Sequence, residues 1–211
     1  IRDISQKEVP DASLISVRRS GLQALTVTFL RFDPVLRTAD GYLINKEGVL
    51  FYSKIQNGIY PIITIASSSV IDATYNKLPV KKITAKHFSF NESYLENLLD
   101  FLDKITTIIF PVSSIVVTSD GDTIMYDERE YSKVLFLHDG DLEKTWSTLV
   151  SAIDTDPLKT KLEKDKEKLL YLDVRFGNKV FYKFGDGFKQ ASSPAIIDDY
   201  DTSAYATSTT N

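Results

Sequence analysis

The sequence predicts an α+β fold, a mixed and mostly antiparallel sheet with two main helices packed on it. Short segments in which apolar and polar residues alternate predict strands, and two segments with apolar residues at three-four spacing predict helices. Along the 211 residues these elements follow the order strands, helix, strands, helix, strands. Hydrophobic residues make up 43% of the chain, enough for a sizeable core, and the 12 Phe and 11 Tyr favour strands.

The first 34 residues predict a pair of strands. One strand begins at Leu14-Ile15-Ser16-Val17, and Ser20-Gly21 supplies a turn. Leu25–Phe29 then alternates at period two, as a strand with one buried face does. Asp33-Pro34 is expected to end this unit.

More short strands are expected before the first helix. They fall between Tyr42 and Ile65, with turns at Lys46-Glu47-Gly48 and at Asn57-Gly58. Leu78-Pro79 closes this first half of the chain.

Two helices are predicted with well-defined apolar faces. The first begins at Ser89-Phe90-Asn91-Glu92, a capping-box pattern. Its apolar face comprises Tyr94, Leu95, Leu98, Leu99, Leu102 and Ile105. The second begins near Asp139, and its apolar face comprises Leu142, Trp146, Leu149, Val150 and Ile153. A third, charged stretch at Pro157–Lys168 predicts a short exposed helix with Asp156 as N-cap and Pro157 at its first position.

A hairpin is predicted between the two main helices. Ser114–Ser119 and Thr123–Tyr126 flank the turn signal Asp120-Gly121-Asp122, and Lys133–Leu137 adds a further strand.

A last hairpin, Leu170–Phe184, can be drawn in two registers. A two-residue loop, Gly177-Asn178, would set Phe176 opposite Lys179. A three-residue loop, Gly177–Lys179, instead sets Asp173 opposite Lys183, an opposite-charge pair. It also collects apolar residues on one face, namely Leu172, Val174, Phe176, Val180, Tyr182 and Phe184. We predict this second register, in which Tyr171, Arg175 and Phe181 occupy the other face.

The composition changes at the end of the chain. Residues 191–211 are rich in Ser, Thr and Asp, contain no Lys or Arg and show no period. This composition predicts a disordered tail.

The residues that catalysis and metal binding require are sparse. The chain has no cysteine, which excludes disulfides, thiolate catalysis and cysteine-ligated zinc. His87 and His138 are the only histidines and lie in no metal-ligand spacing. Asp120-Gly121-Asp122 and Asp139-Gly140-Asp141 lack the alternating ligands of a calcium loop, so turn and N-cap roles are expected. We therefore predict no enzyme activity, no metal and no cofactor.

The bulk properties also narrow the class of partner. A net charge of −4 gives no electrostatic reason to expect nucleic-acid binding. No apolar run reaches the roughly 18–20 residues that span a bilayer.

Several motifs, taken in order, resemble the FtsQ/DivIB family of bacterial cell-division proteins. Val17-Arg18-Arg19, followed by Leu25–Phe29 and Asp33-Pro34, resembles the end of that family's POTRA domain. The segment from Tyr42 to Phe51, with its Glu-Gly turn, and the later Leu78-Pro79 are similar to the next signatures. Tyr171-Leu172-Asp173-Val174-Arg175-Phe176-Gly177-Asn178 resembles the closing strand and is the most specific match. The resemblance covers roughly residues 12–188.

The resemblance implies a domain division and a location. Residues 1–34 would be the end of a truncated POTRA domain, residues 35–190 an FtsQ-type β domain, and residues 191–211 the tail. The portion in hand would be extracytoplasmic, on the periplasmic or cell-surface side. It would be held at the cell membrane by a single-pass segment absent from this chain.

The resemblance further implies a non-catalytic divisome scaffold. FtsB/FtsL-like division proteins would bind by strand addition at the C-terminal hairpin. The partner-binding residues would be Arg175, Phe176, Val180, Phe181, Tyr182 and Lys183, with Phe181 and Arg175 as an anchor pair. In this picture Phe181→Asp and Arg175→Glu weaken binding and leave the fold intact. Two alternatives remain open: a generic envelope module of POTRA type for assembly or chaperoning, and a secreted hydrolase, which a polar pocket would favour.

Overall fold

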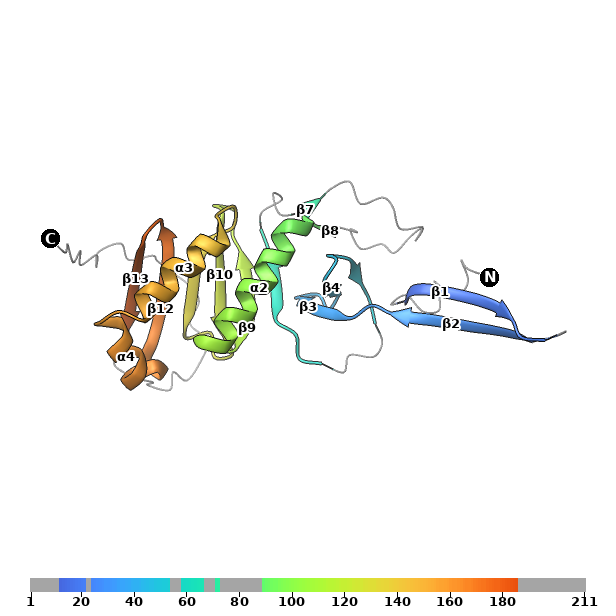
Figure 1. Cartoon of the computed structure of the whole chain (residues 1–211), viewed down its shortest axis with the longest axis horizontal. Coiled ribbons are helices and arrows are strands. Elements are labelled where there is room, and N and C mark those ends of the chain that lie inside the picture. Colours follow the sequence, from blue (N-terminus) through green and yellow to red (C-terminus); the bar gives the residue numbers. More distant parts are fainter. Residues whose placement is uncertain (1–11, 22–23, 54–57, 67–70, 73–88, 186–211) are drawn as a thin grey trace.

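The structure is a computed structural model that describes residues 12–21, 24–53, 58–66, 71–72 and 89–185 (Figure 1). The expectations for Asn57, Leu78-Pro79, His87 and residues 191–211 lie outside these residues. The structure is α+β, as the sequence predicts.

Nine strands form one large sheet, in the order β13-β12-β11-β10-β9-β6-β3-β4-β5. Their bounds are β3 Pro34–Thr38, β4 Leu43–Asn45, β5 Leu50–Phe51, β6 Ile62–Ile65, β9 Val112–Val117, β10 Asp122–Asp127, β11 Lys133–Leu137, β12 Leu169–Phe176 and β13 Lys179–Phe184. The neighbours β3/β6, β6/β9 and β11/β12 run parallel, and the remaining neighbours are antiparallel. The sheet is therefore mixed and mostly antiparallel. A separate small sheet pairs β7 (Ile71–Asp72) with β8 (Ser89–Phe90).

Three α-helices accompany this sheet in the described part of the chain: α2 (Glu92–Ile108), α3 (Leu142–Ile153) and α4 (Leu158–Asp165), the last followed by the 3-10 turn η2 (Lys166–Lys168). Figure 1 shows α2 and α3 lying across one face of the strands. Their apolar stripes and the facing strand residues form one core cluster. In this cluster the ring of Phe101 (α2) packs on that of Phe136 (β11), with ring centroids 4.7 Å apart. It also packs edge to face on Trp146 (α3), with centroids 6.0 Å apart. Trp146 is therefore half-buried and packs against the core, as its place on the apolar face predicts.

Both main helices begin close to where the sequence predicts, but one cap differs. α3 is capped by Asp141, whose Oδ1 accepts the Lys144 N–H at 3.0 Å, as the N-cap expectation has it. α2 is capped by Asn91, whose Oδ1 accepts the Tyr94 N–H at 3.4 Å. The expected capping box at Ser89 is wrong because the backbone of Ser89 is committed to β8.

The third helix also starts one residue later than expected. Pro157 occupies the N-cap position of α4 and Leu158 its first turn. Asp156 still bonds to a free donor of the first helical turn, since its Oδ1 accepts the Thr160 N–H at 3.3 Å and the Thr160 hydroxyl at 2.6 Å. These bonds, ahead of weaker contributions from nearby lysines, lower the pKa of Asp156.

The two N-terminal strands form a ribbon apart from the main sheet. β1 (Ala12–Arg19) pairs antiparallel with β2 (Leu25–Arg31), and the ribbon extends away from the domain (Figure 1). Every residue of β2 is exposed, Leu25 by 58%, so the expected buried face of this strand is wrong within the described structure. Alternation identified the strand correctly, but it could not say what covers the apolar face. The ribbon ends at Arg31, so Asp33-Pro34 marks the end of this unit as expected. Pro34 then opens β3 of the main sheet, at a position where a strand tolerates proline.

Candidate protein-binding edge of the sheet

β13 is the last strand in the order of the nine-stranded sheet and pairs, among described residues, only with β12. Its backbone groups point alternately towards β12 and away from it. The Gly185 N–H donates to the Lys168 carbonyl at 2.8 Å, on the β12 side, and Phe176 pairs with Lys179 at the turn. The N–H and C=O groups of Val180, Tyr182 and Phe184 therefore point outward, along an edge that is open in the described part of the chain.

The register of this hairpin differs from the predicted one. Phe176 pairs with Lys179 across the two-residue loop Gly177-Asn178, and Gly177 has a φ of +70°, which glycine adopts readily. Farther from the turn, Asp173 pairs with Phe181, so the expected Asp173–Lys183 pair is wrong. Neither simple loop length describes both ends of the ladder.

A bulge in β12 reconciles the two ends. Between the Asp173–Phe181 and Phe176–Lys179 pairs, Val174 and Arg175 together face a single β13 residue. A second irregularity lies between Leu169 and Tyr171, also on β12. β13 itself is regular, which keeps its outward groups in strict alternation.

The bulge also moves one predicted core residue to the surface. Leu172 and Val174 are buried, and Val180, Tyr182 and Phe184 pack against the core cluster, as predicted. Phe176 instead is 48% exposed and packs edge to face on Phe181, with ring centroids 5.1 Å apart. The predicted face is therefore correct except at Phe176, because the extra residue reverses the parity next to the turn.

Arg175 is held by carboxylates of its own chain. Its Nε and Nη2 donate to Asp173 at 2.9 and 2.6 Å, and its Nη1 donates to Asp122 of β10 at 2.5 Å. The hydrogen bonds that Arg175 donates to Asp173 are the main cause that raises the pKa of Arg175, although burial opposes them. The guanidinium carbon lies 5.5 Å from the centre of the Phe176 ring. We refer to Arg175, Asp173 and Asp122 as the arginine clasp.

The clasp corrects one expectation about the fold. Arg175→Glu would place three carboxylates together where the side chains are only 10 to 22% exposed. We therefore expect this variant to destabilise the fold as well as to affect binding, because like charges in a partly desolvated site repel strongly. Phe176 lies against both residues of the predicted anchor pair, with its ring on Phe181 and beneath the Arg175 guanidinium.

A lysine completes the charge arrangement on this face. Lys133 of β11 pairs with Tyr171 in the parallel ladder. Burial lowers the pKa of Lys133, the nearby Arg175 lowers it further, and Asp173 acts in the opposite direction. The face of the sheet turned away from the helices thus carries a mixed group of charges close to the edge.

The remaining predicted residues lie along the edge. Lys179 and Lys183 are exposed, and Phe181 is half-buried on the face away from the helices. On the helix side, the Lys161 ammonium of α4 lies 5.7 Å from the ring centre of Tyr182 and 5.8 Å from that of Phe184. The structure thus brings all six predicted residues into one hairpin, with Val180 and Tyr182 turned to the core side.

Sequence reasoning missed two residues of this region. Asp122 was assigned only a turn role, and Lys161 only a place in a charged helix. Asp122 is 53 residues from Arg175 in the sequence, and the contacts of both residues depend on how β10 and α4 are arranged around the hairpin. An isolated acid at the start of a strand gives no signal of a distant arginine.

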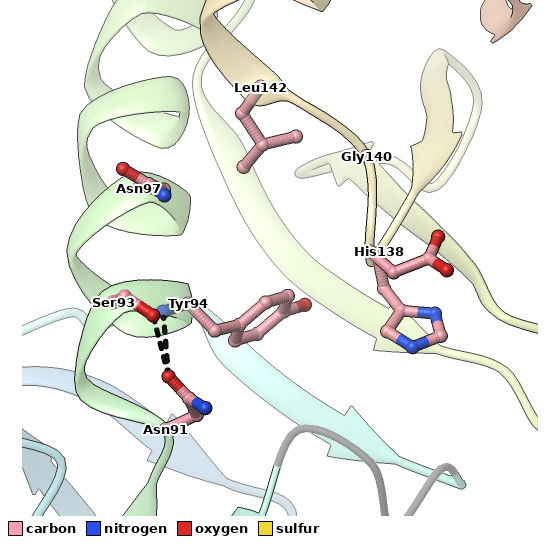
Figure 2. Close-up of a pocket in the computed structure, with 8 residues that line it drawn as sticks. Asn91, Ser93, Tyr94, Asn97, His138, Gly140 and Leu142 are labelled. Atoms are coloured by element: carbon pink, nitrogen blue, oxygen red, sulfur yellow. Dashed lines mark hydrogen bonds between the residues drawn. The ribbon is translucent and has the colours of Figure 1, made fainter.

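The hydrolase alternative can be examined at a polar pocket of about 280 Å³ between the start of α2 and the loop before α3 (Figure 2). Its lining comprises Asn91, Ser93, Tyr94, Asn97, His138, Asp139, Gly140 and Leu142. The Tyr94 hydroxyl lies 3.3 Å from the Thr123 hydroxyl oxygen, and burial raises the pKa of Tyr94 to about 12. The phenol is therefore neutral at ordinary pH.

Two polar side chains of this pocket make hydrogen bonds to residues at the helix cap and the neighbouring turn. The Ser93 hydroxyl donates to Asn91 Oδ1 at 2.7 Å, beside the helix cap (Figure 2). His138 Nδ1 lies 2.6 Å from the Gly121 carbonyl, which fixes the loop to the β9–β10 turn. In these contacts Ser93 bonds to Asn91, and His138 bonds through Nδ1 to the Gly121 carbonyl.

Two further properties concern the described residues alone. They contain no group of three acidic or histidine side chains placed to hold a metal ion. None of their helices is both long and apolar enough to cross a bilayer.

No family model matches the chain, and no curated protein matches it significantly.

Proposed function

We propose that this protein is a non-catalytic scaffold of the bacterial cell-division machinery that binds FtsB/FtsL-like partners by adding their strand to β13. The observation that carries the proposal is the open edge formed by the outward backbone groups of Val180, Tyr182 and Phe184. An edge strand of this kind offers a row of donors and acceptors to an extended segment. The motif resemblance, strongest at residues 171–178, supplies the identity of the partner.

The surroundings of the edge suit a protein ligand. The Phe176–Phe181 pair presents aromatic surface next to the edge, and aromatic residues are enriched at binding hot spots. The arginine clasp acts in this proposal by holding the bulge and Phe176, and only its unused N–H groups remain for a partner carboxylate.

The remainder of the proposal concerns location. The β1–β2 ribbon would be the end of a POTRA domain, and the domain would lie on the extracytoplasmic side of the cell membrane. A single-pass anchor outside this chain would hold it there.

Strand addition is tested by removing one outward donor. Val180→Pro deletes an N–H that points away from β12, so the β12–β13 ladder keeps its bonds. Val180→Ala is the matched control, since it shortens the same side chain and keeps the N–H. We expect Val180→Pro to weaken binding of the FtsB/FtsL-like protein at least tenfold, measured by titration calorimetry, with Val180→Ala close to wild type. Equal binding by both variants, with unchanged circular dichroism, would place the interface away from β13.

A further inference from the structure

The open edge of β13 also has the geometry to pair with itself. In an antiparallel pair, outward-facing residues of one strand must lie opposite outward-facing residues of the other. On β13 these are Val180, Tyr182 and Phe184. Outward-facing residues alternate with inward-facing ones, so the two members of each pair are separated by an even number of positions. When two copies pair about a two-fold axis, the axis therefore passes beside a residue, and not between two residues.

Only two positions of the axis give a long overlap within the strand. An axis beside Phe181 pairs residues 179–183 of the two copies, and an axis beside Tyr182 pairs residues 180–184. The first sets Lys179 opposite Lys183 on both sides of the axis, which is unfavourable because like charges directly opposite destabilise a sheet. The second sets Lys183 opposite Phe181 and leaves Lys179 outside the overlap. Charge therefore selects the axis beside Tyr182.

The side chains in that register are complementary on both faces. On the helix side, Tyr182 meets Tyr182 of the second copy and Val180 meets Phe184, so an aromatic pair is flanked by pairs of aromatic and β-branched residues. On the other face, Lys183 meets Phe181, a cation beside an aromatic ring. The strand sequence Val180-Phe181-Tyr182-Lys183-Phe184 is thus matched to its own reverse.

We propose that two copies of this chain associate through β13, antiparallel about a two-fold axis beside Tyr182, and join their sheets into one. The contact is small, so the dimer is weak and reversible. It does not depend on the proposed cell-division role. If a partner strand does add at this edge, the dimer and the partner complex exclude each other, and self-pairing limits access to the partner.

The test is sedimentation velocity of the whole chain over a wide range of concentration, without any partner. About 0.15 M salt is used, because the Lys161 side chains of the two copies approach each other and such salt screens charges over about 8 Å. The wild type should show a reversible monomer–dimer equilibrium. Phe181→Lys sets two Lys–Lys pairs across the axis and should weaken the dimer at least tenfold. Adding Lys183→Glu converts both pairs to Lys–Glu and should restore it.

Lys179→Glu is the matched control for register. With the axis beside Tyr182 it should leave the dimer unchanged, whereas with the axis beside Phe181 it would strengthen the dimer. Circular dichroism and the melting temperature establish that each variant is folded. A wild type that stays monomeric at about 1 mM overturns the proposal, as does a folded Phe181→Lys/Lys183→Glu protein that fails to recover the dimer. A monomeric wild type that still binds the FtsB/FtsL-like protein would leave the proposed function standing.

Discussion

Replacing Arg175 by Met should destabilise the domain, because it removes the cation that is hydrogen-bonded to two partly buried carboxylates. The side chains of Arg175, Asp173 and Asp122 are 22, 10 and 20% exposed. Breaking a fully buried ion pair by removing one partner costs about 3–5 kcal/mol, and exposed pairs contribute about 0–1 kcal/mol. The clasp lies nearer the buried limit, so we expect a loss of about 2–4 kcal/mol. Methionine retains most of the aliphatic length, which limits the loss of packing.

Urea unfolding measures this loss. With a slope of about 2 kcal/mol per molar, typical of a small protein, the midpoint should fall by about 1–2 M and the slope should not change. Arg175→Lys keeps the charge but not the two-pronged geometry, so its loss should be intermediate. The double variant with Asp173→Asn removes the unpaired acid as well, and a coupling of about 1–3 kcal/mol should appear in the cycle. A loss below about 1 kcal/mol together with additive single effects would refute this account of the clasp.

Two further predictions concern α2 and α3. The pKa of Tyr94 is about 12 in the folded protein and 10.0 in a free tyrosine. The stability due to its neutral phenol is therefore complete below pH 10 and is lost between pH 10 and 12. Urea midpoints from pH 9 to 11.5 should therefore fall less in Tyr94→Phe than in the wild type, and parallel falls would contradict this assignment. Asp141→Ala should lower the free energy of unfolding by about 1 kcal/mol, because it removes the N-cap of α3. Asp141→Asn keeps an acceptor for the Lys144 N–H and should lose only part of this stability in the same urea assay.

The sequence by itself determined the kinds of element and, for the two main helices, the side that each one buries. In α2, the apolar stripe contains Leu95, Leu98 and Ile105, all fully buried in the structure. A side-chain period of 3.6 or 2 is a local property of the backbone, so it can be read without knowledge of the fold. For the same reason the turn at Gly121, with a φ of +92°, was visible in the sequence.

The tertiary structure decided what depends on distant neighbours. The hairpin register followed neither local rule, because bulges in β12 change the pairing without changing the sequence signal. The partners of Arg175 lie on two strands, and Asp122 is 53 residues away in the chain. Whether the apolar side of Leu25–Arg31 is covered likewise depends on what packs against it. Periodicity predicts on which face of an element a residue lies, but only the packed fold determines what contacts that face. The candidate edge at β13 likewise depends on the order of strands in the sheet, which no single segment encodes.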